Sequence, residues 1–261
     1  MQLFDTHAHM DADRFDQDRA EILADMPKHQ IRYLMNVGCD ASSSLASVRL
    51  AEEYPFIYAA VGSHPDDAAA MGEDLIALYR ELATQHQKVR AIGEIGLDYH
   101  YEDVPRAQQK RCFIRQLELA RELKLPVIVH EREAHGDALE ILQDFPDVTG
   151  VFHCFSGSAE MARQLVTRGW YIGFTGVITF KNARKAVEVV EDMPLSRLLL
   201  ETDCPYMAPE PFRGKRNDSR YLYRMAERVA EIRGKTPKEI AKITLENGLR
   251  LFGIAEETVY F

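Results

Sequence analysis

The sequence has few features of a secreted or membrane protein, and these absences narrow its class. Its 261 residues include only four cysteines, and no two of them form a C-x-x-C pair. No stretch reaches the roughly 18 consecutive apolar residues of a membrane span. The first residues show no basic region followed by an apolar run, as a secretory leader would. We therefore expect reduced thiols and a cytoplasmic protein that does not bind a membrane.

An excess of basic residues is also missing. The chain has 32 Lys and Arg residues against 41 Asp and Glu residues, which gives a net charge of -9. This balance argues against a protein that coats nucleic acid with a basic surface. It leaves room for an enzyme that grips nucleic acid through metal ions and a local basic patch. Nothing in the sequence indicates an obligate protein partner.

What the sequence does contain is a regular alternation of apolar, β-branched runs with segments of helical periodicity. The runs are 3–9, 31–37, 56–62, 89–95, 126–130, 149–155, 170–175 and 198–203. In the segment 105–124 the apolar positions share one helical face, at Phe113, Leu117, Ala120 and Leu123. Strands separated by helices imply parallel βαβ units. Eight such units predict an α/β fold, a (β/α)8 TIM barrel that forms a single domain over residues 1–261.

The barrel is expected to carry an extra helix at its C-terminus. One helix is expected near residues 222–233. The last helix should begin at Thr236-Pro237-Lys238-Glu239, because this segment has Thr as N-cap, Pro at the first helical position and Glu at the capping-box position.

Histidines and carboxylates stand at the ends of several expected strands. His7 and His9 alternate with one residue between them, so a strand would point both imidazoles to the same side. The other such residues are Glu94, His130, His153 and Asp203. A polar side chain at the end of an apolar run is costly to bury without a partner. Because barrel enzymes build their sites at the carboxyl ends of the strands, we expect these six residues to form a metal site.

The composition of this ligand set indicates two ions. Four histidines and two carboxylates exceed the needs of one tetrahedral ion and suit two adjacent divalent ions. Glu94 is able to bridge them through its two oxygens. Asp203 is expected to bind one ion and to accept the proton of the attacking water. Magnesium, manganese and zinc all remain compatible with these ligands.

Basic residues near the expected barrel mouth indicate phosphate binding. The loop after the eighth strand carries Arg213, Lys215, Arg216 and Arg220. Arg132 follows His130 by two residues. Barrels commonly bind phosphate in the loops after strands seven and eight, and we expect Arg213 and Lys215 to do so here. His64 is expected at the rim, where it either contacts a substrate phosphate or orders its loop.

Two tyrosines near strand ends have two interpretations. Tyr99 and Tyr206 are positioned to stack on a nucleobase. Aromatic residues at strand ends also serve packing, and the sequence leaves both roles open.

These motifs together resemble the TatD family of metal-dependent deoxyribonucleases, a branch of the amidohydrolase-like barrels, along essentially the whole chain. The matching segments are 4–9, 61–65, 92–99, 129–134, 153–157, 201–206 and 213–217. The resemblance implies the same six metal ligands and hydrolysis of DNA from the 3′ end. Related barrels that hydrolyse small amides or esters often carry a lysine where this chain has Glu94, which favours the nuclease branch. Cys204 stands where the family usually has Ser or Ala, and we interpret it as a packing change.

Three functions remain open on these grounds. The leading one is a two-metal deoxyribonuclease, a 3′-5′ exonuclease that trims single-stranded or frayed DNA ends. The alternative keeps the metals and hydrolyses a small amide, lactone or aminoacyl ester. The third is a binding module with a structural metal, which is disfavoured because structural sites usually close around four ligands.

Overall fold

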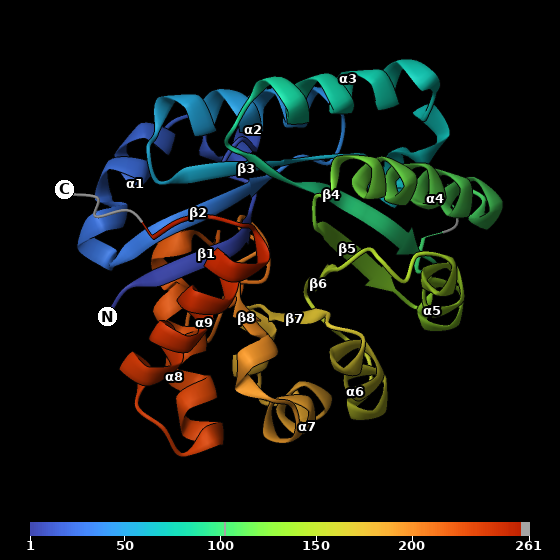
Figure 1. Cartoon of the computed structure of the whole chain (residues 1–261). Coiled ribbons are helices and arrows are strands. Elements are labelled where there is room, and N and C mark those ends of the chain that lie inside the picture. The colour runs from blue at the N-terminus through green and yellow to red at the C-terminus, as the bar shows by residue number, and fades with distance from the viewer. Residues whose placement is uncertain (102, 257–261) are drawn as a thin grey trace. The chain divides into compact units, whose positions relative to one another are not determined.

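Eight short parallel strands, each followed by a helical segment, build the computed structural model, which describes residues 1–101 and 103–256 (Figure 1). The strand order follows the sequence from β1 to β8. Sequential parallel strands with helical crossovers are the topology of a (β/α)8 barrel, and the predicted fold class is confirmed. Among the described residues, no helix has the length and apolar character that a bilayer crossing requires.

The chain divides into two compact units. Unit 1 comprises residues 1–35 and 157–261, and unit 2 comprises residues 36–156. Strand β2 (Ile31–Val37) begins in unit 1 and ends in unit 2. Unit 1 is therefore made from two separate stretches of sequence, whereas unit 2 is one continuous stretch.

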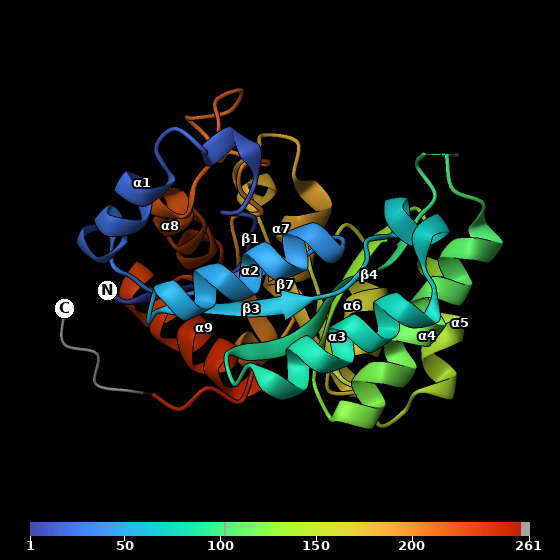
Figure 2. The ribbon, with the colours of Figure 1, turned by 90° about the horizontal axis from the view of Figure 1, so that it is seen from above.

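Unit 2 contains four strands that pair in parallel. Its strands are β3 (Ile57–Val61), β4 (Val89–Asp98), β5 (Val127–Arg132) and β6 (Gly150–Phe152). Its helices are α2 (Ala41–Glu53), α3 (Glu73–Gln85), α4 (Arg106–Leu123) and α5 (His135–Ile141). Helix α2 packs along β3, and α3 and α4 pack along β4, as the view from above shows (Figure 2). The pairing brings the carboxyl ends of β4 and β5 to one edge.

The expected apolar face of α4 explains its packing. Phe113, Leu117 and Ala120 are fully buried, and Leu123 at the last turn is half-buried. Because β4 is covered by these side chains, its own residues are almost entirely buried. The strand runs on to Asp98, three residues beyond the expected end.

Unit 1 holds the first strand and the last two, with helices at the end of the chain packed on them. Its strands are β1 (Leu3–Ala8), β7 (Tyr171–Phe174) and β8 (Leu198–Leu200). Its helices are α1 (Arg19–Asp25), α6 (Ala159–Thr167), α7 (Arg184–Asp192), α8 (Leu222–Arg233) and α9 (Pro237–Leu251). Helix α9 lies against β1 and β8 and beside α8. The Thr236 hydroxyl accepts a hydrogen bond from the Glu239 amide, which confirms the expected start of the C-terminal helix.

Two strands end earlier than the sequence indicates. Strand β8 stops at Leu200, and β6 stops at Phe152. As a result Asp203 and His153 lie on irregular backbone just past their strands. Their conformation is therefore set by local contacts rather than by a regular sheet.

Candidate metal centre

Three of the expected ligands meet in unit 1 and form what we call cluster 1: His7, His9 and Asp203. The Nε2 atoms of His7 and His9 lie 3.0 Å apart. Asp203 Oδ1 lies 3.5 Å from His9 Nε2 and 3.8 Å from His7 Nε2. All three residues are buried. Two imidazole nitrogens and a carboxylate oxygen thus point to one place, as donors to a cation do.

The backbone between β1 and the segment after β8 fixes cluster 1. The Asp203 amide donates to the His7 carbonyl at 2.9 Å, and the His9 amide donates to the Cys204 carbonyl at 2.8 Å. Asp203 has φ 54°, in the left-handed region that Asp tolerates better than most residues. These contacts turn the Asp203 side chain toward the two histidines.

The buried carboxylate of Asp5 holds Thr202, the residue before Asp203, in place. Asp5 Oδ2 accepts a hydrogen bond of 2.6 Å from the Thr202 hydroxyl, and Oδ1 accepts one of 2.9 Å from the Thr202 amide. Burial raises the pKa of Asp5 to about 6, although hydrogen bonds from Ser219 and Thr202 oppose the shift. Cys204 is fully buried, with its Sγ 3.7 Å from the sulfur of Met10, so its side chain serves packing as expected.

The other three expected ligands meet in unit 2, together with His64, and form cluster 2: His64, Glu94, His130 and His153. Glu94 is at its centre. Its Oε1 lies 2.7 Å from His153 Nε2, 3.0 Å from His130 Nδ1 and 3.8 Å from His64 Nε2. Donor atoms of His64, Glu94 and His130 all lie within 4.8 Å of one another. The cluster offers imidazole nitrogens around one carboxylate, which is again a donor set for a divalent ion.

Glycine 96 lets β4 approach β5 beside cluster 2. It has φ 145°, and a Cβ atom there would lie 1.9 Å from the His130 carbonyl oxygen. Any other residue would push the two strands apart where Glu94 and His130 must meet.

Asp98 is a site residue that the sequence analysis missed. Its Oδ2 lies 2.9 Å from His130 Nε2, on the side of the ring opposite Glu94. A carboxylate that holds the far nitrogen of a ligand histidine fixes the ring's orientation and tautomer. The sequence does contain a pattern that points to Asp98. Glu94 and Asp98 stand an even number of residues apart, so they would share a face of one strand.

The protonation of His130 follows from these two carboxylates. Burial lowers the pKa of His130, but hydrogen bonds to Asp98 and Glu94 outweigh it and raise this pKa to about 10 in the metal-free protein. Burial raises the pKa of Asp98, but the hydrogen bonds from His130 and from the His100 amide lower it below its usual value. The two carboxylates therefore favour the protonated form of the His130 imidazole that lies between them.

Helix α4 holds Asp98 in place. The Gln109 side chain accepts a hydrogen bond from the Asp98 amide and donates one to the Asp98 carbonyl, both at 2.8 Å. Gln109 is itself buried. The position of Asp98 is thus tied to the helix that covers β4.

The structure separates the expected phosphate contacts into two groups. Arg216 and Arg220 are tied into ion pairs, with Asp18 and with Asp218 and Asp25 respectively. No ion pair to a described residue engages Arg213 or Lys215, and both are exposed. The Arg213 guanidinium lies over the Phe180 ring, 4.4 Å from its centroid. Arg213 and Lys215 thus keep the capacity to bind phosphate.

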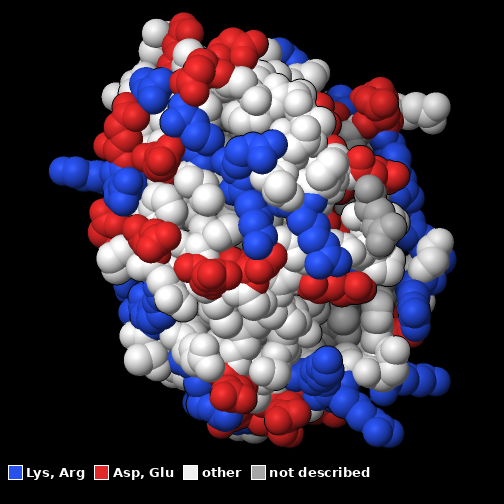
Figure 3. All heavy atoms as spheres, turned by 90° about the vertical axis from the view of Figure 1, so that its right-hand side faces the viewer, with Lys and Arg blue, Asp and Glu red and all other residues white. Residues whose placement is uncertain are grey.

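In unit 2 the basic residues are mixed with acids. Figure 3 shows the face that carries α4 and α5, where Lys and Arg side chains alternate with Asp and Glu. Arg132 lies over the Tyr101 ring, 5.3 Å from its centroid. The Tyr99 hydroxyl donates to Asp137, and Arg106 covers its ring, so packing is the role of Tyr99 in this structure.

His64 caps a short helix as well as facing the site. Its Nδ1 accepts a hydrogen bond of 3.2 Å from the Asp66 amide at the start of the 3-10 helix Pro65–Ala70. Its Nε2 points to Glu94. The loop-ordering role that the sequence left open is therefore present.

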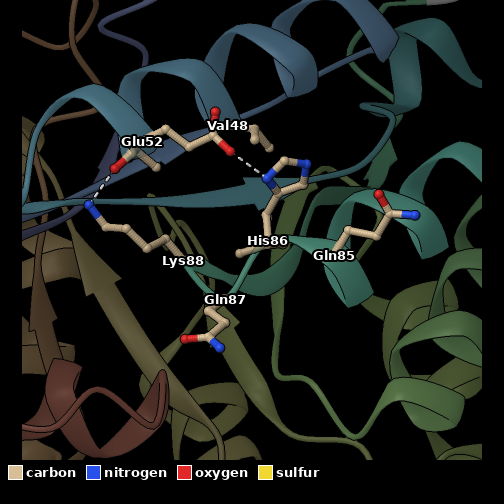
Figure 4. A pocket seen from close by; sticks show the side chains of 8 residues that line it. Val48, Glu52, Gln85, His86, Gln87 and Lys88 are labelled. Atoms are coloured by element: carbon tan, nitrogen blue, oxygen red, sulfur yellow. Dashed lines mark hydrogen bonds and ion pairs between the residues drawn. The ribbon is translucent and has the colours of Figure 1, made fainter.

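Unit 2 has a cavity of about 150 Å³ whose lining includes no residue of either cluster (Figure 4). It is lined by the end of α2 and the segment before β4, including Glu52, His86 and Lys88. His86 Nδ1 lies 2.6 Å from Glu52, and Lys88 donates to the Tyr54 carbonyl at 2.7 Å. These polar groups satisfy one another, and none belongs to the expected ligand set.

Comparison with known proteins gives one consistent result. A family model described as TatD related DNase matches residues 4–253. The uncharacterized metal-dependent hydrolase YabD of Bacillus subtilis is 46% identical over 254 residues, which cover 97% of this chain and 99% of that protein. The 3′-5′ ssDNA/RNA exonuclease TatD of Cronobacter sakazakii is 35% identical, with coverage of 96% and 97%. The crystal structure of the TatD homolog YJJV of Escherichia coli has a TM-score of 0.91 at 32% identity and covers 97% of this chain and 98% of its own.

Proposed function

The chain belongs to the TatD related DNase family of metal-dependent hydrolases, and we propose that it is a two-metal deoxyribonuclease that removes nucleotides from the 3′ end of single-stranded or frayed DNA. The observation that supports this most is the pair of histidine–carboxylate clusters at the carboxyl ends of parallel strands. In a (β/α)8 barrel these ends belong to the active-site face. We propose that each of the two clusters supplies ligands to a divalent ion.

The donor set fits two divalent ions. Imidazole nitrogens suit zinc, manganese and iron, and carboxylate oxygens also admit magnesium. In this proposal the ions would be held by His7, His9, Glu94, His130, His153 and Asp203. Bound divalent ions supply a Lewis acid for the phosphate and a water that deprotonates near neutral pH.

The remaining chemistry falls to the chain's own residues. Asp203 orients the attacking water and takes its proton on the carboxylate. Arg213 and Lys215 bind the phosphates of the strand and hold the terminal linkage in place. The water oxygen bonds to phosphorus, and the P–O3′ bond breaks. The penultimate O3′ leaves and receives the proton that Asp203 took from the water, and the terminal nucleotide departs as its 5′-monophosphate.

The function is tested with metal-stripped protein to which Mg, Mn or Zn is added back. The substrates are end-labelled single-stranded DNA, RNA of the same sequence, and a set of small amides, lactones and aminoacyl esters. We expect metal-restored shortening of the DNA from its 3′ end. Intact DNA under every metal, together with turnover of an ester, would reject the nuclease in favour of the amidohydrolase alternative.

Variants of the exposed residues Arg213 and Lys215 provide a second way to distinguish the nuclease from the amidohydrolase alternative. Reversing Arg213 and Lys215 to Glu should abolish cleavage of DNA, because both cations would become charges that repel phosphate. A neutral ester should be spared. The matched control is the double reversal Lys238→Glu and Lys242→Glu on α9, which makes the same change in net charge on unit 1. Equal effects of the two double variants would contradict a specific role for Arg213 and Lys215.

A further inference from the structure

Unit 1 exposes two large apolar side chains next to a candidate metal ligand. Among the described residues the large hydrophobics that are exposed are Leu45, Tyr101, Tyr206 and Met207. Two of the four, Tyr206 and Met207, are neighbours that follow Asp203 by three and four residues, and they are 53% and 41% exposed. Exposed apolar surface that adjoins a functional site commonly contacts a ligand.

The Tyr206 ring lies directly beside cluster 1. Its centroid is 6.4 Å from that of His9, and the two rings are inclined by 67°. A nucleotide whose phosphate contacts an ion at cluster 1 would thus meet the Tyr206 ring beside it.

The backbone that carries these exposed side chains is held firmly. The Tyr206 amide donates to the Asp203 carbonyl at 2.9 Å, and the Tyr206 carbonyl accepts a hydrogen bond of 2.6 Å from the buried Asn217 amide. The Met207 carbonyl lies 1.9 Å from where a Cβ on Gly176 would stand, so only glycine admits this contact. The loops after β7 and β8 thus fix a preformed shelf, which we define as Tyr206 and Met207.

Cations of the same unit complete the features of a nucleotide site. Arg213 and Lys215 follow in the same loop, and Phe180 supports the Arg213 guanidinium. Aromatic faces combined with nearby cations bind single strands with little sequence preference, because every base has a π-face.

We propose that Tyr206 and Met207 form a subsite that stacks the terminal nucleobase while its phosphate lies at the metal centre. This inference rests on the proposed nuclease function and names the part of the substrate that the shelf recognises. It predicts a preference for nucleotides over abasic sugar phosphates, and for purines over pyrimidines because the larger base stacks over more of the ring. Tyr206 contributes the aromatic face, and Met207 extends the apolar surface.

The subsite is tested by isothermal titration of the manganese-loaded full chain with dAMP, dTMP and 2-deoxyribose 5-phosphate. The wild-type protein should bind dAMP roughly tenfold to a hundredfold more tightly than the sugar phosphate. Tyr206→Ala should reduce this ratio to about twofold or less while the affinity for the sugar phosphate stays unchanged. Tyr206→Phe keeps the ring and should keep the ratio, and Tyr206→Leu should keep only part of it. Met207→Ala should lower the ratio less than Tyr206→Ala does.

The outcomes separate this proposal from the nuclease assignment. Equal affinities of the wild type for dAMP and the sugar phosphate would overturn the subsite, as would an unchanged ratio in Tyr206→Ala. Cleavage of end-labelled DNA by the same preparation is scored independently. If the protein cleaves DNA but binds dAMP and the sugar phosphate equally well, the nuclease assignment stands and the subsite at Tyr206 and Met207 is rejected. Base discrimination that depends on Tyr206, without cleavage of any strand, keeps the shelf as a nucleotide site and rejects the exonuclease.

Discussion

Clusters 1 and 2 differ in which of their donor atoms lie closest to one another. In cluster 1 two imidazole nitrogens face each other at 3.0 Å, and the carboxylate of Asp203 stands farther away. In cluster 2 the carboxylate of Glu94 is in hydrogen-bonding contact with two imidazoles, and Asp98 holds the far side of His130. The shortest contact of cluster 1 thus joins two imidazoles, whereas the shortest contacts of cluster 2 join imidazoles to carboxylates. Because the two carboxylates raise the pKa of His130 to about 10, an ion bound by His130 would have to displace a proton.

The largest effect is expected from removing the only carboxylate of cluster 1. Asp203→Asn abolishes the proposed proton acceptor and should lower kcat on end-labelled DNA by roughly a hundredfold to ten-thousandfold. Single-turnover cleavage with manganese measures it. Metal analysis of the same variant should show that cluster 2 still binds an ion. Asp137→Asn, which removes an acid paired with Lys110 in unit 2, is the control and should be nearly silent. Activity of Asp203→Asn within tenfold of wild type would remove Asp203 from the proton-transfer step.

The next effect concerns the outer carboxylate of cluster 2. Asp98→Ala leaves His130 without its orienting partner and should weaken metal binding by roughly tenfold to a hundredfold. Asp98→Asn keeps an oxygen that accepts from His130 Nε2, so its loss should be smaller. Competition with a chelating dye measures the affinity, and a melting curve in EDTA reports folding separately. If the alanine variant binds metal as the wild type does, Asp98 does not position His130.

A smaller effect is expected on the unfolding free energy of the metal-stripped protein at alkaline pH. The pKa of His130 is about 10 when folded, above its ordinary value of 6.5, so His130 stabilises the fold fully below pH 6.5. This contribution is lost as the pH rises through 10. The difference in unfolding free energy between wild type and Asp98→Ala should therefore shrink from pH 6.5 to 10, as chemical denaturation in EDTA would show. A difference that stays constant with pH would contradict the proton in cluster 2.

The smallest effect is expected on stability at acid pH and comes from Asp5 in unit 1. The pKa of Asp5 is about 6 when folded, above its ordinary value of 3.8, so the neutral form favours the fold. Its contribution to stability is present below pH 3.8 and is lost as the pH rises through 6. Asp5→Asn is neutral throughout, so wild-type stability relative to this variant should decline between pH 4 and 6 and then level off. Thermal melts over this range test it, and a relative stability that rises instead would reverse the assignment.

The sequence predicts the regular elements well, since local periodicity carries the information. His7 and His9 alternate along the expected strand. In the structure His7 lies in β1 and His9 directly follows its end, and their Nε2 atoms lie 3.0 Å apart. The start of α9 follows from the capping residues at Thr236 and Glu239. Each of these features depends on residues a few positions apart.

Features set by distant contacts could not be predicted in this way. Asp203 lies on irregular backbone that is shaped by hydrogen bonds to β1, nearly two hundred residues earlier in the chain. Arg216 looks as available as Arg213 in the sequence, yet Asp18 binds it. Asp98 was missed because β4 was expected to end at Ile95 and in fact continues to Asp98.

Because unit 2 is one continuous stretch of sequence and unit 1 is not, the residues of the two clusters become complete at different times during synthesis. Every residue of cluster 2 lies within the continuous stretch 36–156. Cluster 1 joins His7 and His9 to Asp203, so it cannot form until most of the polypeptide has left the ribosome. A nascent chain that has emerged as far as His153 already carries all the donors of cluster 2. The order of translation therefore gives cluster 2 the first opportunity to capture an ion, before the residue proposed to move the proton has been made.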